Sequence, residues 1–216
     1  MTVQEELRRR IDREVFDYRQ VTDCLRDYAK PRDKIGALLA SGFLVRVRKG
    51  LYVFGETWRR QPVAREALAN LIYGPSYISL EYALGYYGLI PERVETVTSV
   101  TTGKARRFQT SFGLFTYRPL SAARYAAGMT LEESGSGSFF IATPEKALAD
   151  FVWADRRFRP ADVVGFADYL HDDLRIDPAR LTALDRDRLD QIAARYAARK
   201  VTLLAAYVRQ LRRRRV

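Results

Sequence analysis

The side chains that most often perform catalysis are scarce in this chain. Cys24 is the only cysteine and His171 the only histidine among 216 residues, so a zinc site of the cysteine–histidine type is excluded. A nucleophile–histidine pair would have to use His171. That residue stands in Leu170-His171-Asp172-Asp173, which resembles a helix end, so we predict an exposed side chain. Cys24 is predicted to be a small, partly buried core residue.

A metal-dependent nuclease could be built on Glu145, Lys146 and Asp150, which lie near the predicted end of a sheet. Glu145 and Lys146 are adjacent and diverge around a helix, so we expect Glu145 to favour the helix N-terminus and Asp150 to cap or pair locally. Neither G-x-x-x-x-G-K-[ST] nor G-x-G-x-x-G occurs. The sequence predicts no catalytic residue, no metal ligand and no cofactor, and the nuclease is kept as the alternative.

Cationic side chains offer a different chemistry, which is the binding of phosphates and base edges. Arginine and lysine donate charge-assisted hydrogen bonds to both kinds of acceptor. Five such residues stand close together in the sequence: Arg32, Lys34, Arg46, Arg48 and Lys49. We predict that they form a DNA-binding site.

Two helices are predicted to position the first of these cations. One begins at Asp17, with Gln20 in capping-box spacing, and the other runs from Pro31 to Gly42. The second has a face of small and charged residues: Arg32, Asp33, Gly36, Ala37 and Ala40. Such a face lets a helix lie deep in a major groove. The alternative is that Gly36 and Ala37 pack against another helix.

A basic hairpin follows directly. Val45 and Val47 alternate with Arg46 and Arg48, which predicts valines on the core face and both arginines on the other. The turn Lys49-Gly50 can be tight because glycine accepts a positive φ. Helix, helix and hairpin in this order are typical of a winged helix-turn-helix. A solvated charged edge that prevents strand aggregation is the alternative for the hairpin.

The composition supports a polyanionic partner. The net charge is +11, and most of the excess lies in residues 1–60 and 143–216, with a nearly neutral middle. A hydrophobic content of 47% suits packed cores. No run approaches the ~20 apolar residues of a transmembrane helix, and the N-terminus lacks the apolar core of a signal peptide. We expect a cytoplasmic protein with no membrane partner.

Residues 55–61 have no apolar period and are predicted to be a linker. We therefore expect an α+β protein with a winged helix-turn-helix over residues 1–58 and a mixed α+β domain over residues 59–216, in which helices flank an antiparallel-rich sheet. A four-residue spacing from Val3 to Val15 predicts a preceding scaffold helix. Further predicted helices are 62–72, 79–87, one from Thr143, 161–170 and 186–213. Predicted strands are 95–101, 106–110, 113–118, 126–131 and 138–142, with a turn at 134–137.

Two further basic segments carry hypotheses. Lys104, Arg106 and Arg107 follow a predicted hairpin turn at Thr102-Gly103 and could form an auxiliary basic surface for a phosphate backbone or a protein partner. A solvated loop is the alternative. The tail at residues 212–215 could contact nucleic acid, although cations are also favoured at a helix C-terminus by the macrodipole.

Several segments resemble the AbiEi family, the antitoxins of type IV toxin–antitoxin systems used in bacterial abortive infection. The resemblance extends from about Asp17 to the Trp153 region. Its segments are Arg48–Tyr52, Tyr77–Leu84, Gly88–Glu92 (Gly-Leu-Ile-Pro-Glu) and Thr143–Asp150 (Thr-Pro-Glu-Lys-Ala-Leu-Ala-Asp).

The resemblance implies an N-terminal winged helix that represses its own operon and a C-terminal domain that opposes a nucleotidyltransferase-like toxin. On that pattern Arg32 and Lys34 fall on the recognition helix, and Arg46, Arg48 and Lys49 on the wing. The implied partners are double-stranded promoter DNA and the toxin. The resemblance is weaker at the N-terminal helix and the arginine-rich tail, whose roles it leaves open.

Overall fold

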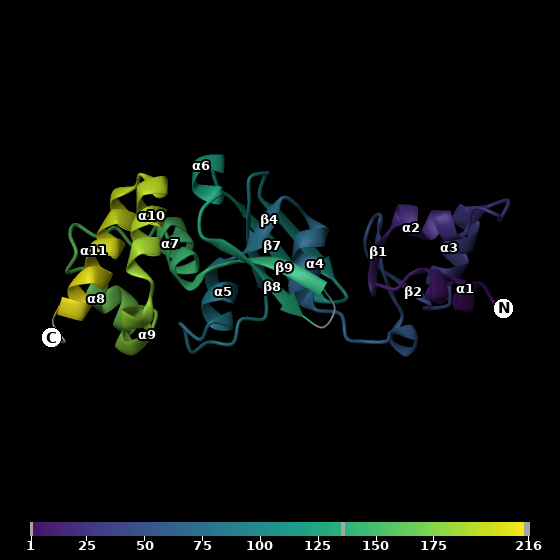
Figure 1. Cartoon of the computed structure of the whole chain (residues 1–216), viewed down its shortest axis with the longest axis horizontal. Helices are drawn as coiled ribbons and strands as arrows, with labels where there is room; N and C mark the ends of the chain where they lie inside the picture. Colours follow the sequence, from purple (N-terminus) through teal and green to yellow (C-terminus); the bar gives the residue numbers. More distant parts are fainter. Residues whose placement is uncertain (1, 135–136, 214–216) are drawn as a thin grey trace.

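The computed structural model describes residues 2–134 and 137–213, so the centre of the predicted turn at 134–137 and the end of the basic tail lie outside the described residues. The fold is mixed α+β with a three-stranded and a six-stranded sheet. The molecule is elongated, with the N-terminal elements at one end, the larger sheet in the middle and the C-terminal helices at the other end (Figure 1).

The N-terminal elements begin with a helix that is shorter than predicted. They are α1 (Val3–Arg10), β1 (Val15–Asp17), α2 (Tyr18–Cys24), α3 (Pro31–Ala40), β2 (Leu44–Arg48) and β3 (Leu51–Phe54). The predicted continuation of α1 to Val15 is wrong, because Ile11 is extended and Val15 pairs with Val53 as part of a strand. Asp17 and Gln20 form the predicted capping box of α2, and Pro31 opens α3.

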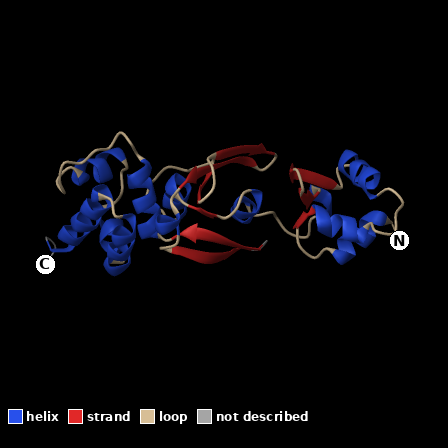
Figure 2. Cartoon of the chain, turned by 90° about the horizontal axis from the view of Figure 1, so that it is seen from above, coloured by secondary structure: helices blue, strands red, loops and turns tan. Residues whose placement is uncertain are grey.

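The small sheet, ordered β1-β3-β2, has two apolar faces. Phe16, Tyr52 and Phe54 face one way and pack with the buried residues of α1, α2 and α3. Val15 and Val53 alternate with them and belong to the apolar core of the rest of the molecule. In the turned view the small sheet lies on the side of the N-terminal elements that faces the larger sheet (Figure 2).

Residues 55–61, predicted to be a linker, are packed onto the N-terminal elements. They contain a short 3₁₀ helix, η1 (Glu56–Trp58), and the Trp58 ring lies 5.0 Å from that of Phe43. A Cβ atom at Gly55 would lie 2.0 Å from the carbonyl oxygen of Gly42, so only glycine allows this close approach. Arg59 Nε donates to the carbonyl oxygen of Phe54 at 2.7 Å.

The larger sheet has the strand order β6-β7-β5-β4-β9-β8. Its strands are β4 (Ser76–Ile78), β5 (Val97–Thr101), β6 (Arg106–Thr110), β7 (Gly113–Pro119), β8 (Met129–Ser134) and β9 (Gly137–Ala142). The β5–β7 and β4–β9 pairs are parallel and the other three pairs are antiparallel. The predicted hairpin turn at Thr102-Gly103 is wrong, because β6 pairs with β7 and not with β5. The predicted strand 126–131 is also wrong at its start, since β8 begins at Met129.

Helices cover the sheet and form the C-terminal end of the molecule. They are α4 (Arg65–Ile72), α5 (Leu80–Tyr86), α6 (Ala122–Tyr125), α7 (Pro144–Ala154), α8 (Phe166–Asp168), the π-helical turn η2 (Tyr169–Asp173), α9 (Pro178–Ala183), α10 (Arg186–Tyr196) and α11 (Arg199–Arg213). The predicted single helix 186–213 is broken at Ala197, whose φ is 46°. The break lets α10 and α11 both pack on α7. Within the described residues, no helix is long and apolar enough to cross a membrane.

The predicted helix 161–170 is only partly correct. Residues 161–165 are not helical, and the regular part is limited to α8, which continues as η2. His171 lies in this π-helical turn and is half-buried, which corrects the predicted exposed side chain. Its Nδ1 lies 3.0 Å from the carbonyl oxygen of Ile176, and its Nε2 lies 2.8 Å from the hydroxyl of Tyr207.

Candidate nucleic-acid interface

A concave surface lies between helix α3 and the β2–β3 hairpin. Its volume is about 770 Å³. It is lined by Tyr18, Arg32, Ile35, Gly36, Arg46, Lys49, Gly50 and Tyr52. We call it the N-terminal groove. Three of the five cations predicted to bind DNA, Arg32, Arg46 and Lys49, therefore meet in one groove, although Arg32 comes from a helix and the other two from the hairpin.

Tyr18 forms hydrogen bonds with both the β2–β3 hairpin and helix α3. Its backbone N–H donates to the carbonyl oxygen of Gly50 at 3.0 Å, which fixes the hairpin turn against the start of α2. Its hydroxyl accepts a hydrogen bond from Arg32 Nε at 3.4 Å, and this bond raises the pKa of the exposed Arg32 guanidinium. Arg32 thus keeps its charge and is held at the edge of the groove.

The face of α3 that borders the groove is open. Arg32, Gly36 and Ala37 are all exposed, and a Cβ atom built at Gly36 has no neighbour within 4 Å. The alternative that Gly36 and Ala37 pack against another helix is therefore wrong. Ile35, which also lines the groove, and Leu38 are buried among the apolar residues of the N-terminal elements.

Arg48 does not share a face with Arg46, which corrects the alternation expected from the sequence. Arg46 pairs with Tyr52, whereas Arg48 pairs with Leu51, so Val47 is an extra residue in β2 and forms a bulge. The bulge turns Arg48 to the face of Leu51. There the Nη2 of Arg48 donates to the carbonyl oxygen of Leu71 at 3.4 Å. Leu71 lies in the last turn of α4.

Lys34 also lies outside the lining of the N-terminal groove. It is half-buried, and its Nζ lies 5.5 Å from the centre of the Tyr28 ring. The cation–π contact holds Lys34, which lies near the start of α3, against Tyr28 in the loop between α2 and α3.

The three residues of the hypothesised auxiliary basic surface are exposed but do not form one patch. Arg106 and Arg107 are neighbours in the edge strand β6, so their side chains point to opposite faces of the sheet. The backbone N–H of Lys104 donates to the Tyr73 hydroxyl at 3.2 Å. Arg106 and Arg107 therefore cannot contact one flat ligand together, and each defines a separate basic position.

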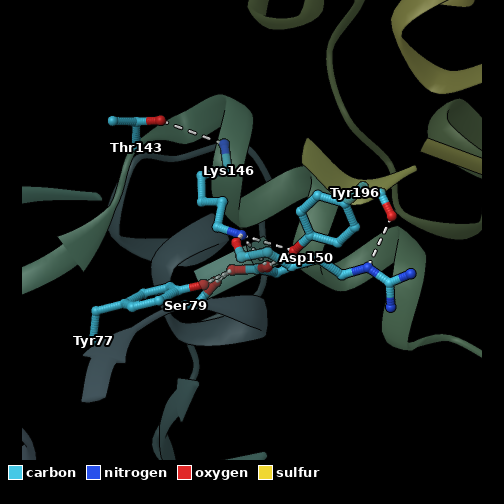
Figure 3. A network of polar contacts seen from close by, with 7 residues as sticks. Tyr77, Ser79, Thr143, Lys146, Asp150 and Tyr196 are labelled. Atoms are coloured by element: carbon cyan, nitrogen blue, oxygen red, sulfur yellow. Dashed lines mark hydrogen bonds and ion pairs between the residues drawn. The ribbon is translucent and has the colours of Figure 1, made fainter. Parts of the chain in front are cut away.

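A buried cluster of polar side chains centres on Asp150 (Figure 3). Its Oδ2 accepts hydrogen bonds from the hydroxyls of Tyr77 at 3.0 Å and Ser79 at 2.6 Å. Its Oδ1 accepts from the Tyr196 hydroxyl and lies 3.0 Å from Lys146 Nζ. Lys146 and Asp150 are 0% and 1% exposed.

The Lys146 ammonium has three partners inside the fold. Besides Asp150, its ammonium donates to the carbonyl oxygen of Arg124 at 2.7 Å and to the Tyr196 hydroxyl at 2.8 Å. Burial lowers the pKa of Lys146, and the nearby Asp150 carboxylate acts in the opposite direction. Burial raises the pKa of both Tyr77 and Tyr196, and the negative charge of Asp150 adds to this effect.

The cluster joins three parts of the chain that are distant in sequence. Tyr77 belongs to β4, Ser79 precedes α5, Lys146 and Asp150 lie on α7, and Tyr196 ends α10. Asp150, predicted to cap or pair locally, does pair with Lys146 one helical turn away. The contacts with Tyr77, Ser79 and Tyr196 were missed, because no spacing in the sequence reveals contacts between such separated residues.

Glu145 is also held inside the fold. One of its oxygens accepts the backbone N–H of Asp185 at 2.9 Å, and the other lies 3.5 Å from Arg188 Nη1. It thus anchors the start of α10 and does not meet Asp150 in a common site. Among the described residues, no group of three or more His, Cys, Asp and Glu side chains is arranged to hold a metal ion. None of Glu145, Lys146 and Asp150 is open to a substrate.

No protein-family model matches the chain, and no curated protein is detectably similar to it.

Proposed function

We propose that the protein is a DNA-binding transcriptional repressor and the antitoxin of a type IV toxin–antitoxin system. In this proposal α2, α3 and the β2–β3 hairpin form a winged helix-turn-helix. The N-terminal groove binds double-stranded DNA of the protein's own promoter. The remainder of the chain opposes a nucleotidyltransferase-like toxin.

The DNA-binding part of the proposal is supported by one observation. Arg32, Arg46 and Lys49 line the same groove, which is bordered by the open face of α3. A helix with exposed small residues can approach the floor of a major groove closely, and arginine can donate two hydrogen bonds to guanine. Lys49 stands at the hairpin turn, where a wing meets the phosphate backbone. The exposed end of α3 thus supplies base contacts and the hairpin supplies positioning contacts.

The antitoxin part is supported by the resemblance of the segments around Gly88–Glu92 and Thr143–Asp150 to the AbiEi family. Co-expression with a nucleotidyltransferase encoded beside this protein tests it directly. Growth should be restored when the two proteins are produced together. Continued growth arrest, with both proteins present and folded, would remove the antitoxin assignment and leave the DNA-binding one intact.

Promoter binding should depend strongly on salt. If the three groove cations each neutralise one phosphate, the logarithm of the binding constant should fall with a slope of about −2.7 against the logarithm of salt concentration. Affinity should then fall about fortyfold between about 50 and 200 mM salt. Mobility-shift titrations of promoter and random DNA measure both the slope and the preference for the promoter. Equal affinity for the two sequences, or a flat salt dependence, contradicts the proposal.

Substitutions at Gly36 test whether the α3 face is open in solution as it is in the structure. Gly36→Ala is expected to raise the free energy of unfolding by about 1 kcal/mol, because alanine favours a helix and the added Cβ meets open space. Gly36→Glu should keep the fold and weaken promoter binding about tenfold or more, since its carboxylate would enter a groove that receives phosphates. Chemical denaturation and mobility shifts provide the two measurements. Destabilisation by Gly36→Ala would mean that this face is packed.

A further inference from the structure

A second basic concavity is lined by residues of α5 and β7, the end of α7 with the loop after it, and the start of α11. Helices α7 and α11 lie on the side of the larger sheet away from α3 (Figure 1). The concavity consists of two adjoining hollows of about 620 and 360 Å³. Both are lined by Trp153, Asp155 and Arg156. We call the pair of hollows the C-terminal cleft.

The C-terminal cleft is strongly cationic. Its positively charged lining residues are Arg118, Arg156, Arg157, Arg159, Arg199 and Lys200. Its two carboxylates, Glu81 and Asp155, already have partners: Glu81 lies 3.5 Å from Arg118, and Asp155 lies 3.5 Å from Arg157. The cations outnumber the carboxylates, so the cleft attracts an anionic ligand.

The loop that carries these cations is held in place. Asp155 accepts the backbone N–H of Arg157 at 3.0 Å and the Tyr169 hydroxyl at 3.1 Å. Burial raises the pKa of Asp155, but these hydrogen bonds more than offset it, and the pKa is lowered overall. Phe158 stacks on Tyr169 with ring centres 3.6 Å apart. The loop therefore presents the exposed Arg156 and Arg159 from a fixed backbone.

Trp153 adds an aromatic surface to both hollows. It is half-buried, and the Arg124 guanidinium lies 5.1 Å from its ring centre. Phe158 is less available, because Tyr169 stacks on it and Lys200 Nζ lies 5.3 Å from its ring centre. Aromatic rings beside arginines form the usual platform for an unpaired base and its phosphates.

We propose that the C-terminal cleft binds a nucleotide, with its phosphates on Arg156 and Arg159 and its base on Trp153. The volume of the larger hollow suits a small ligand. A base within a duplex is stacked and cannot reach an indole in a hollow, so the ligand is a single nucleotide unit. This unit is either a free nucleoside triphosphate or the phosphorylated end of a single strand. The site is separate from the N-terminal groove and goes beyond the proposed repressor function.

Trp153 fluorescence provides the test on the full chain. The sequence has two tryptophans, so Trp58→Phe leaves Trp153 as the single reporter. ATP and a 5′-phosphorylated hexathymidylate are titrated in separate arms, and tripolyphosphate is the anion without a base. Saturable quenching by ATP or the oligonucleotide is expected, with weaker binding of tripolyphosphate. Tighter binding of the oligonucleotide than of ATP identifies a strand end as the ligand, and the reverse order identifies the free nucleotide.

Three variants locate the binding. Arg156→Glu with Arg159→Glu should weaken binding at least about a hundredfold, since two charge-assisted contacts with the phosphates are lost. Arg9→Glu with Arg13→Glu makes the same charge change at exposed N-terminal residues and should have little effect. Alanine at Arg32, Arg46 and Lys49 should leave nucleotide binding unchanged, which keeps this test independent of the repressor proposal.

Three outcomes would contradict the proposed nucleotide site. One is the absence of saturable quenching and of calorimetric binding at millimolar ATP and oligonucleotide. Another is loss of binding in the Arg32, Arg46 and Lys49 variant with retention in the Arg156 and Arg159 variant, which moves the ligand to the N-terminal groove. Equal affinity for tripolyphosphate and ATP removes the role of Trp153 in base stacking. Circular dichroism confirms that each variant is folded.

Discussion

Replacing Arg32, Arg46 and Lys49 together by alanine is expected to weaken promoter binding about a thousandfold or more. Each of the three side chains can donate charge-assisted hydrogen bonds to DNA, and the loss of one such bond costs about 1.5–3 kcal/mol. All three are exposed and only Arg32 has a side-chain hydrogen bond in the described fold, so the free energy of unfolding should change little. Mobility-shift titration measures the affinity, and chemical denaturation checks stability.

Arg48→Ala is the matched control for this experiment. Arg48 lies on the same hairpin and carries the same charge as Arg46, but the bulge turns it toward Leu71 and away from the groove. Its replacement should change promoter affinity less than Arg46→Ala does. An Arg48 variant with the greater loss would show that the DNA lies on the other face of the sheet.

The same triple variant tests whether the two proposed activities can be separated. A promoter–reporter assay should show loss of repression, while co-expression with the toxin should still restore growth. Retained repression would mean that the N-terminal groove is not the reading surface. Simultaneous loss of both activities in a folded variant would mean that DNA binding is required for protection.

Asp150→Ala is expected to lower the free energy of unfolding by about 3–5 kcal/mol. The substitution leaves the fully buried Lys146 ammonium without its anionic partner, and an unpaired buried charge is strongly destabilising. It also removes the acceptor of the Tyr77 and Ser79 hydroxyls. Urea denaturation followed by circular dichroism measures the loss.

Asp190→Ala provides the corresponding control at the surface. Asp190 pairs with Arg209 at 3.1 Å, but the two side chains are 38% and 48% exposed, so its replacement should cost less than about 1 kcal/mol. Replacing Lys146 by methionine in the Asp150→Ala background should recover part of the lost stability, because the uncompensated charge is then removed. Equal effects of Asp150→Ala and Asp190→Ala would contradict a structural role for the buried cluster.

Local features of the fold could be predicted from the sequence because neighbouring residues determine them. The capping box at Asp17 and Gln20 and the start of α7 at Thr143 and Pro144 depend on contacts within one helical turn. The open face of α3 also follows from a helical period. The convergence of Arg32 with Arg46 and Lys49 could be anticipated for the same reason, since a helix followed by a hairpin brings the two together.

Other features depend on contacts between residues distant in sequence, and these features could not be predicted from the sequence. The β2 bulge adds one residue without changing the alternation of valine and arginine, so the orientation of Arg48 was predicted wrongly. The strand β1 is recognised only through its pairing with β3. The role of Asp150 requires Tyr77 and Tyr196 to be brought to it by the fold. The residues of the C-terminal cleft likewise come from separate helices and loops.

The small N-terminal sheet is shared between two cores, and this has a consequence for how the protein should unfold. Val15, Val47 and Val53 belong to the same apolar core as the larger sheet, while Phe16 and Phe54 belong to the core of the N-terminal helices. Neither part can lose its structure without exposing apolar surface of the other to water. We therefore expect the two parts to stabilise each other, and a fragment that begins after residue 58 to carry an uncovered apolar surface. Point variants, which leave this surface covered, are the appropriate means of assigning separate roles to its two ends.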